Sequence, residues 1–299
     1  MCGIAGFIAN DSSTLGGDLN RMLRKLIHRG TDATGVAFYE NRDHVKLRVA
    51  LSRPEAEAEL KALVEARARI IDSRTYQGKG VYTFYEASLS MDPGAIQELN
   101  WELDSHPDLC VHSIGPRISI YKDEGSAAEL AQRHEIAPGP CSHGIGHVRL
   151  ATESVENINL AHPFTSYLLP ELALVHNGQF TNYFNMRRSL EAKGIRFKTT
   201  NDSEMAAHFI AWQMTDKGLS LEEALNLGLD TFDGVFTLLV ATDNMIGALR
   251  DRLGIKPMVY FRQEEGRVLF GSEQICLTPI VDDVFATEME PGEVKTWSV

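Results

Sequence analysis

The stretch Met1-Cys2-Gly3-Ile4-Ala5-Gly6-Phe7 opens the chain, and its second residue sets the direction of the interpretation. A small second residue permits removal of the initiator methionine, so we expect the mature chain to begin at Cys2. A cysteine in that position carries a thiol and a free α-amine, whose reference pKa of about 8 lies close to working pH. The amine can then act as the base for its own thiol, without a histidine partner. A cysteine near a terminus is incidental more often than not, so other segments must decide.

Composition limits the classes of protein that this chain can represent. Its 299 residues, 43% of them hydrophobic, suffice for one large domain or for one domain with a smaller insert. The net charge of −12 argues against nucleic acid and anionic membranes as partners. Four cysteines without metal-ligand spacing are typical of a reducing cytoplasm, so we expect a cytoplasmic protein. We read no leader peptide and no apolar run approaching about 18 residues, so we expect no membrane span.

The hydrophobic pattern alternates between the periods of strands and helices. Leu19, Met22, Leu23 and Leu26 follow the spacing of a one-faced helix. By the same criterion we expect helices over 19–27, 54–71, 124–135, 183–192 and 203–214. We expect strands over 3–9, 35–39, 45–51, 80–86, 117–121, 144–150, 172–175, 235–242, 245–249, 257–262 and 267–271. Many strands with few helices predict α+β layers rather than regular βαβ repeats.

Four further segments combine glycine with side chains that can bind or react. They are His28-Arg29-Gly30-Thr31-Asp32-Ala33-Thr34-Gly35, Gly146-His147-Val148-Arg149-Leu150-Ala151-Thr152, Val175-His176-Asn177-Gly178-Gln179 and Asn201-Asp202-Ser203-Glu204. With the opening heptapeptide, they resemble the glutaminase domain of class II, N-terminal-nucleophile glutamine amidotransferases, in that family's order. The resemblance covers roughly residues 2–51 and 141–279. It implies a four-layer α/β/β/α sandwich with the N-terminal cysteine at the end of a central strand.

The resemblance also implies a reaction centre built on Cys2. In this family the N-terminal cysteine attacks the side-chain amide of L-glutamine and forms a thioester. The Asn177 side chain and the Gly178 backbone N–H would stabilise the tetrahedral oxyanion, each such donor being worth roughly 3–4 kcal/mol. A glycine at that position also lets the backbone approach the substrate closely.

Glutamine is a zwitterion, so its charged ends need partners of opposite charge. Arg149 is the candidate for the α-carboxylate, since a guanidinium binds a carboxylate bidentately. Asp202 is the candidate for the α-ammonium group. The resemblance also assigns Thr152 to substrate binding, and it assigns Arg29 and His176 to supporting positions around the site.

Plainer interpretations of the same residues stay open. Arg149 can be a surface ion-pair partner, and Asp202 can be the N-cap of the helix that comes after it. Asn177-Gly178 is also a hairpin-turn signal. Three histidines lack the spacing of a usual metal motif, so we expect no metal site; they are His28, His147 and His176.

The spacing of the motifs predicts an extra segment. About 117 residues separate Arg29 from Gly146, so residues 52–140 are interpreted as an insertion, either a lid, a docking subdomain or an ammonia-handling element. Leu150 stands where many relatives carry an aromatic residue. Three C-terminal segments resemble the closing strands of glutaminase domains in amidophosphoribosyltransferases and asparagine synthetases; they are residues 234–236, 249–258 and 271–273.

No acceptor module is readable in the sequence. A P-loop, a Ser-Gly-Gly pyrophosphatase loop and a phosphoribosyltransferase-like run are all missing. We therefore expect a glutamine amidotransferase subunit that passes ammonia to a separate synthase subunit, with no cofactor in this chain. The likeness to stand-alone glutaminase subunits favours a glutamate-synthase-like system of the N-methylglutamate synthase type. The alternatives are a free-standing amidohydrolase, or a catalytically idle regulatory subunit that binds glutamine.

Overall fold

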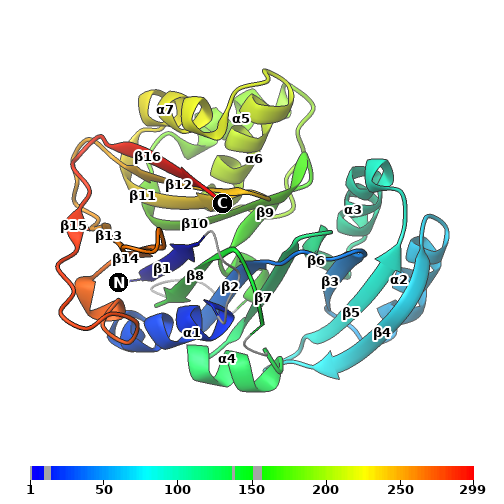
Figure 1. The fold of residues 1–299 in the computed structure, drawn as a ribbon. Helices are drawn as coiled ribbons and strands as arrows, with labels where there is room; N and C mark the ends of the chain where they lie inside the picture. Colours follow the sequence, from blue (N-terminus) through cyan, green and yellow to red (C-terminus); the bar gives the residue numbers. More distant parts are fainter. Residues whose placement is uncertain (1, 10–14, 137–138, 151–156) are drawn as a thin grey trace.

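The strand directly after Cys2 lies at the centre of a seven-stranded sheet in a computed structural model of the chain (Figure 1). The structure describes residues 2–9, 15–136, 139–150 and 157–299. In order across the sheet, the strands are β15 (Thr287–Glu288), β13 (Val259–Arg262), β14 (Val268–Gly271), β1 (Gly3–Ile8), β8 (His143–Arg149), β2 (Ala33–Tyr39) and β7 (Ile118–Glu124). β1 pairs antiparallel with both of its neighbours, β14 and β8.

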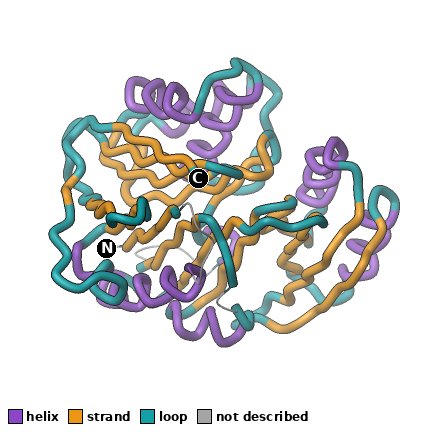
Figure 2. Tube along the Cα trace, in the orientation of Figure 1, coloured by secondary structure: helices purple, strands orange, loops and turns teal. Residues whose placement is uncertain are grey.

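A second sheet of five strands packs on the first. Its order is β16 (Val294–Ser298), β12 (Met245–Arg250), β11 (Gly234–Ala241), β10 (Leu169–Phe180) and β9 (Phe164–Ser166). Helices cover the outer faces of both sheets (Figure 2). The seven-stranded sheet carries α1 (Leu15–Lys25) and α4 (Ala127–Arg133), and the five-stranded sheet carries α5 (Tyr183–Glu191), α6 (Asp202–Thr215) and α7 (Leu221–Thr231).

Three hydrophobic clusters hold these layers together. Ile4 and Ile8 of β1 point into the cluster between the two sheets. Phe7, on the opposite face of β1, packs under α1. The third cluster joins α6 and α7 to the five-stranded sheet. Because alternate side chains of β1 are buried on both faces, its sequence is an unbroken apolar run. The predicted α+β four-layer sandwich is confirmed.

A third sheet lies beside the sandwich (Figure 1). Its four strands are β4 (Arg69–Gln77), β5 (Thr83–Ser90), β3 (Val45–Leu51) and β6 (Leu109–Gly115), and its helices are α2 (Ala56–Glu65) and α3 (Ile96–Ser105). We call residues 45–115 the side module. The sequence predicts an insertion over about 52–140, but the separate sheet already starts with β3. β7 and α4, at the other end of that range, belong to the sandwich.

The side module is attached to the sandwich by buried charges. Arg48 of β3 is only 1% exposed and forms an ion pair with Glu86 of β5. The same guanidinium donates from Nε to the Ile120 carbonyl oxygen of β7 at 2.8 Å and lies 3.2 Å from Nδ1 of His134, the residue directly after α4. The contacts of this one guanidinium therefore link the module to the sandwich.

Several expected elements differ from those in the structure. The helix expected over 54–71 ends at Glu65, and residues 69–77 form β4, because Ile70 and Ile71 belong to a strand that pairs along β5. Asn177-Gly178 does not form a hairpin turn, since both residues lie inside β10. None of the described helices combines the length and apolarity needed to span a membrane.

Short helical turns complete the chain. They are η1 (Ile27–Arg29), η2 (Pro93–Ala95), η3 (Ile158–Leu160) and η4 (Gln274–Cys276). Of these, η1 brings Arg29 to the start of β1. There the Nε of Arg29 donates to the Cys2 carbonyl oxygen at 2.8 Å.

Candidate active site

Cys2 lies at the start of β1 and lines a cavity of about 420 Å³ between the two sheets' ends and the start of α6. Four other residues singled out by the sequence line the same cavity: Arg149, His176, Gly178 and Asp202. They come from β8, from β10 and from α6. Segments far apart in the sequence are thus brought together around one thiol. Thr152, also expected at the substrate, lies outside the described residues.

The surroundings of the Cys2 thiol favour its ionised form. Partial burial opposes ionisation, but a hydrogen bond and charge interaction with His147, and a hydrogen bond with the Leu150 backbone, outweigh it. The pKa of Cys2 consequently falls to about 7. A thiolate is the nucleophilic form of cysteine, so this shift is what a reactive thiol requires.

His147 is expected from the sequence only as a histidine of the core or of a loop. The structure brings it to Cys2 because β8 pairs with β1, with His147 opposite Ile4. One sequence signal could have identified His147 as a site residue: it lies between Gly146 and Arg149, in a segment already selected for its likeness to the family.

The backbone of Cys2 is held by two side chains. Besides Arg29, the Nδ2 of Asn177 donates to the Cys2 carbonyl oxygen at 3.2 Å. Arg29 is in turn ion-paired with Glu273, which was not expected at the site. Ser272 fixes Ile4, two residues after Cys2. Its Oγ accepts from Ile4 N at 2.9 Å, and its own N–H donates to the Ile4 carbonyl oxygen at 2.9 Å. The start of β1 is therefore rigidly positioned.

Asn177 lies beside Cys2, but both hydrogens of its side-chain amide already have acceptors. Its Nδ2 donates to Ser272 Oγ at 3.1 Å as well as to the Cys2 carbonyl oxygen. Its Oδ1 lies 3.2 Å from Nε2 of His147. Both amide hydrogens thus have protein acceptors, and an oxyanion would receive a hydrogen bond from Asn177 only after one of those bonds breaks.

Gly178 needs to be glycine for two reasons. Its φ of +139° lies in the region that L side chains rarely adopt. A Cβ at this position would also lie 1.9 Å from the carbonyl oxygen of Val235 on the neighbouring strand. The glycine allows β10 to keep its pairing with β11 while its backbone forms part of the cavity wall.

Arg149 ends β8 at the cavity, where the chain before β2 packs closely against it. The Asp32 N–H donates to the Arg149 carbonyl oxygen at 3.0 Å. A Cβ on Gly30 would lie 2.3 Å from the carbonyl carbon of Arg149, so only glycine permits this approach. The His28–Gly35 segment therefore supports the end of β8 as well as the Cys2 carbonyl.

Asp202 is the first residue of α6, and its carboxylate is partly exposed to the cavity. One oxygen accepts from Phe180 N at 3.1 Å, and the other lies 3.8 Å from Nδ1 of His176. The helix cap is Asn201, whose side chain accepts from Ser203 N at 2.8 Å. The alternative that Asp202 serves as N-cap is therefore wrong, and its carboxylate remains available for another role.

His176 forms part of the cavity wall as a neutral ring. It stacks on Phe180 with centroids 4.5 Å apart, and its Nδ1 lies 2.9 Å from the Ser203 hydroxyl. Burial lowers the pKa of His176 to about 4, against the opposing charge of Asp202. Within the described ranges, no cluster of three or more His, Cys, Asp or Glu residues has the arrangement of a metal site.

Comparisons with known proteins identify the family of the chain. A family model described as a glutamine amidotransferase domain matches residues 147–279. A protein of Methanothermobacter thermautotrophicus, named provisionally as a glutamine amidotransferase, is 33% identical over 307 residues, covering 100% of both chains. The glutamine amidotransferase-like protein GlxB of Rhizobium meliloti is 35% identical over 308 residues, covering 99% of this chain and 98% of that protein.

Solved structures show the same architecture in a larger protein. The glutamine phosphoribosylpyrophosphate amidotransferase from B. subtilis superposes on 99% of this chain with a TM-score of 0.64 at 18% identity. This chain spans 47% of that one, and at such low identity the likeness concerns the fold alone. The end-to-end similarity to the two sequence relatives carries the assignment: this chain belongs to the glutamine amidotransferase family.

Proposed function

We propose that the chain hydrolyses the side-chain amide of L-glutamine through a thioester on Cys2. The observation that carries the proposal is a single cavity that combines a thiol of lowered pKa with one guanidinium and one carboxylate. Glutamine has an electrophilic amide carbon, an α-carboxylate and an α-ammonium group. Arg149 and Asp202 would hold the two charged ends, leaving the amide to Cys2.

The reaction divides into two acyl-transfer steps. The Cys2 thiolate attacks the amide carbon, and the tetrahedral intermediate collapses with cleavage of the C–N bond. The α-amine of Cys2, free once Met1 is removed, would deliver the proton with which the nitrogen leaves as ammonia. Water then attacks the γ-glutamyl thioester, and the amine accepts a proton from the water. Glutamate is released and the Cys2 thiol is restored.

Stabilisation of the oxyanion would depend on a small rearrangement. The Gly178 backbone borders the cavity, whereas the Asn177 amide is bonded to the Cys2 carbonyl oxygen and to Ser272. Turning one Asn177 hydrogen toward the substrate would add a donor worth roughly 3–4 kcal/mol to the transition state. We therefore expect a low basal rate that rises when a partner or substrate completes the site.

We further propose that the ammonia passes to a separate synthase subunit in the cytoplasm, within a glutamate-synthase-like enzyme. The support is chemical: an amidotransferase needs an acceptor for the nitrogen that it releases. The chain itself would need no cofactor, since amide hydrolysis on a thiol involves no electron transfer.

The test combines intact-mass measurement with glutamine hydrolysis. The purified protein should lack Met1, and a diazoketone analogue of glutamine should add one equivalent, located at Cys2. Cys2→Ala should remove both labelling and hydrolysis. Full activity with Met1 retained, or in Cys2→Ala, would overturn the mechanism.

The partner is tested by adding a candidate glutamate-synthase-like subunit, sought among the products of the neighbouring genes. Hydrolysis should increase on its addition, with ammonia incorporated into the acceptor. An equal rate with and without the subunit would favour the free-standing amidohydrolase. Glutamine binding without hydrolysis in either state would favour the regulatory subunit.

A further inference from the structure

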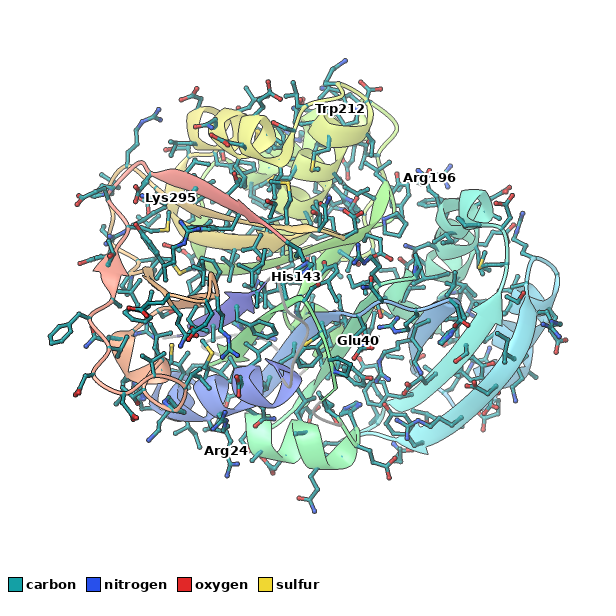
Figure 3. All side chains as sticks on the ribbon, in the orientation of Figure 1. Arg24, Glu40, His143, Arg196, Trp212 and Lys295 are labelled. Carbon is teal, nitrogen blue, oxygen red and sulfur yellow. The ribbon has the colours of Figure 1, made fainter. Side chains whose placement is uncertain are left out.

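Ser203 places a buried hydroxyl group at the edge of the Cys2 cavity, in the first turn of α6. Its side chain is only 1% exposed. Figure 3 labels Trp212 in a later turn of the same helix, which lies along the five-stranded sheet. The proposed hydrolysis gives this hydroxyl no role, although it belongs to one of the segments that the sequence singles out.

Three side chains meet at the hydroxyl oxygen of Ser203. Nε2 of His162 and Nδ1 of His176 each lie 2.9 Å from this oxygen. The hydroxyl is also placed to donate to Oδ1 of Asp202, at 3.3 Å. Because a hydroxyl has one hydrogen and two lone pairs, it can donate to only one of these three groups.

Both histidine rings at this hydroxyl are neutral. Burial lowers the pKa of His162 well below its usual value and lowers the pKa of His176 to about 4. A neutral ring carries a single N–H, on one of its two nitrogens. The hydrogen of each ring is therefore either directed to Ser203 or carried by the nitrogen on the far side of the ring.

The far nitrogens of the two rings decide between these arrangements. Nδ1 of His162 and Nε2 of His176 are buried, and in the described part of the chain neither has a hydrogen-bond partner. A buried N–H without an acceptor is rarer in proteins than a buried acceptor that is not fully used. Both rings therefore direct their N–H to Ser203, which leaves the hydroxyl hydrogen for Asp202.

This direction of hydrogen bonds fixes the Asp202 carboxylate. Oδ1 accepts from the Ser203 hydroxyl, and Oδ2 accepts from Phe180 N at 3.1 Å. With a donor on each oxygen, the carboxylate has one preferred rotation about its last bond. Its side chain is still 25% exposed at the cavity, and its remaining lone pairs can accept from an ammonium group.

The backbone around His162 is held from neighbouring strands. The carbonyl oxygens on either side of it, those of Ala161 and Pro163, accept from a lysine of β7 at 3.2 and 3.4 Å. A Cβ on Gly35 of β2 would lie 2.0 Å from the His162 carbonyl oxygen, so the two segments are in direct contact. The ring that donates to Ser203 is therefore attached to a fixed backbone.

We propose that Ser203 is a positioning residue, which accepts two histidine N–H groups and orients the Asp202 carboxylate toward the α-ammonium group of the substrate. The inference rests on the proposed function and adds the group that controls how the ammonium end is bound. Ser203 acts through Asp202, so its removal should lower the affinity for glutamine and leave the Cys2 thiol unchanged.

The ring tautomers are tested first, without any ligand. Ring-nitrogen NMR shifts of the full chain at neutral pH, assigned with His162→Gln and His176→Gln, should show a hydrogen on Nε2 of His162 and on Nδ1 of His176. A hydrogen on the other nitrogen of either ring overturns the proposal. The shifts are read from the wild type, so the result does not depend on the stability of a Ser203 variant.

Binding is tested by calorimetric titration of the Cys2→Ala variant, which can hold L-glutamine without turning it over. Adding Ser203→Ala should weaken binding by about tenfold or more, because hydrogen bonds to charged groups are the stronger ones. The matched control is Ser166→Ala, which also removes a buried hydroxyl bonded to a histidine, 2.8 Å from Nδ1 of His208, but lies on β9. Unchanged binding in folded Ser203→Ala, or an equal loss in Ser166→Ala, overturns the proposal.

A double-variant cycle locates the effect at Asp202. It is measured as kcat/KM for glutamine with Cys2 intact. On the Asp202→Asn background, Ser203→Ala should change kcat/KM by less than about threefold, because the carboxylate that it orients has been removed. The same loss with and without Asp202 overturns the proposal. If Cys2→Ala bound no glutamine, the proposed substrate would be wrong instead, and the ring tautomers would still decide the arrangement at Ser203.

Discussion

The position of Cys2 and the lowered pKa of its thiol arise from residues of several separate segments. His147 and the Leu150 backbone act on the thiol, while Arg29 and Asn177 hold the carbonyl of the same residue. The first pair controls ionisation, and the second pair controls position. The two effects can be measured separately, because ionisation concerns the thiol of Cys2 and position concerns its carbonyl oxygen.

The contribution of His147 can be measured through the pH dependence of thiol alkylation. In the wild type, the rate of Cys2 alkylation should rise with pH around an apparent pKa of about 7, because only the thiolate reacts. His147→Gln removes the largest lowering interaction, so the profile should move toward higher pH. Mass mapping of iodoacetamide adducts across the neutral pH range checks this. An unshifted profile would mean that His147 does not act on the thiol.

Arg149 and Asp202 should contribute to glutamine use without altering the thiol. Arg149→Lys keeps the charge but loses the planar fork, and Asp202→Asn leaves the α-ammonium group without its counter-charge. We expect kcat/KM for glutamine to fall by about one to two orders of magnitude in each variant, since hydrogen bonds to charged groups are worth roughly 1.5–3 kcal/mol. Arg24→Lys, on the exposed face of α1, is the control. Wild-type kcat/KM in either variant would refute that residue's role.

At the scale of single elements, β10 is constrained by both the sheet and the cavity. It carries Asn177 and Gly178 without interrupting its pairing to β11. The positive φ at Gly178 occurs within a strand, so the glycine is required by the element as well as by the cavity. The strand and the site therefore depend on the same backbone conformation.

Alanine substitutions at two glycines separate strain from steric overlap. Gly178→Ala combines an unfavourable φ with a Cβ 1.9 Å from the Val235 oxygen, so it should lower the free energy of unfolding by more than about 3 kcal/mol. Gly194 has a φ of +85°, but a Cβ there would have no neighbour within 4 Å. Gly194→Ala should therefore lower the free energy of unfolding by only about 1 kcal/mol. Denaturant unfolding measures both. Equal losses would show that the close approach of β11 does not matter.

The elements also show which features the sequence can predict. The apolar runs of β1 and β2 are readable because both faces of these strands are buried. β4 is misread as the end of a helix, since a solvent-exposed strand of mixed polarity lacks a clear period of two. α7 was missed, although Ser220 and Glu223 form a capping box that is visible in the sequence.

At the site, too, residues within sequence motifs are predictable, whereas residues brought in by strand pairing are not. Residues in sequence motifs, such as Arg149 and Asp202, were identified in advance, and they line one cavity. His147 and Glu273 were missed as site residues, because their contacts depend on how β8 and β14 align with β1. Strand register brings together positions far apart in the chain, and no local pattern encodes it.

At the scale of the whole molecule, a cluster of charges inside the side module supports its junction with the sandwich. Glu86 is ion-paired with Arg48, with Lys46 and with Arg74, all residues of the module. Burial opposes its ionisation, but these three cations outweigh burial and lower the pKa of Glu86 to about 2. The ionised carboxylate holds Arg48, whose guanidinium donates across the junction to the Ile120 carbonyl oxygen.

This carboxylate should make the fold sensitive to acid. The pKa of Glu86 is lower in the folded chain than its usual 4.5, so its contribution is complete above about pH 5 and declines as the pH falls toward about 2. A shift of this size corresponds to about 3 kcal/mol. The free energy of unfolding of Glu86→Gln should therefore change less over that acidic range than that of the wild type. Glu98→Gln, which removes an exposed ion pair, is the control and should show the wild-type dependence of unfolding free energy on pH. The same dependence in the wild type, Glu86→Gln and Glu98→Gln would contradict the prediction.

The four thiols of the chain differ widely in acidity. Burial raises the pKa of Cys110, Cys141 and Cys276 to about 12, whereas that of Cys2 is about 7. Oxidants attack the thiolate, so the group proposed to react with glutamine is also the thiol most easily oxidised.

One equivalent of hydrogen peroxide at neutral pH should convert Cys2 to a sulfenic acid and stop turnover. A thiol reductant should restore both the thiol and the activity. Mass spectrometry should find the other three cysteines reduced at that stage, and earlier oxidation of any of them would contradict this order. Supply of nitrogen through such an enzyme would then fall as the cell becomes more oxidising, with no regulator needed beyond the chemistry of one sulfur atom.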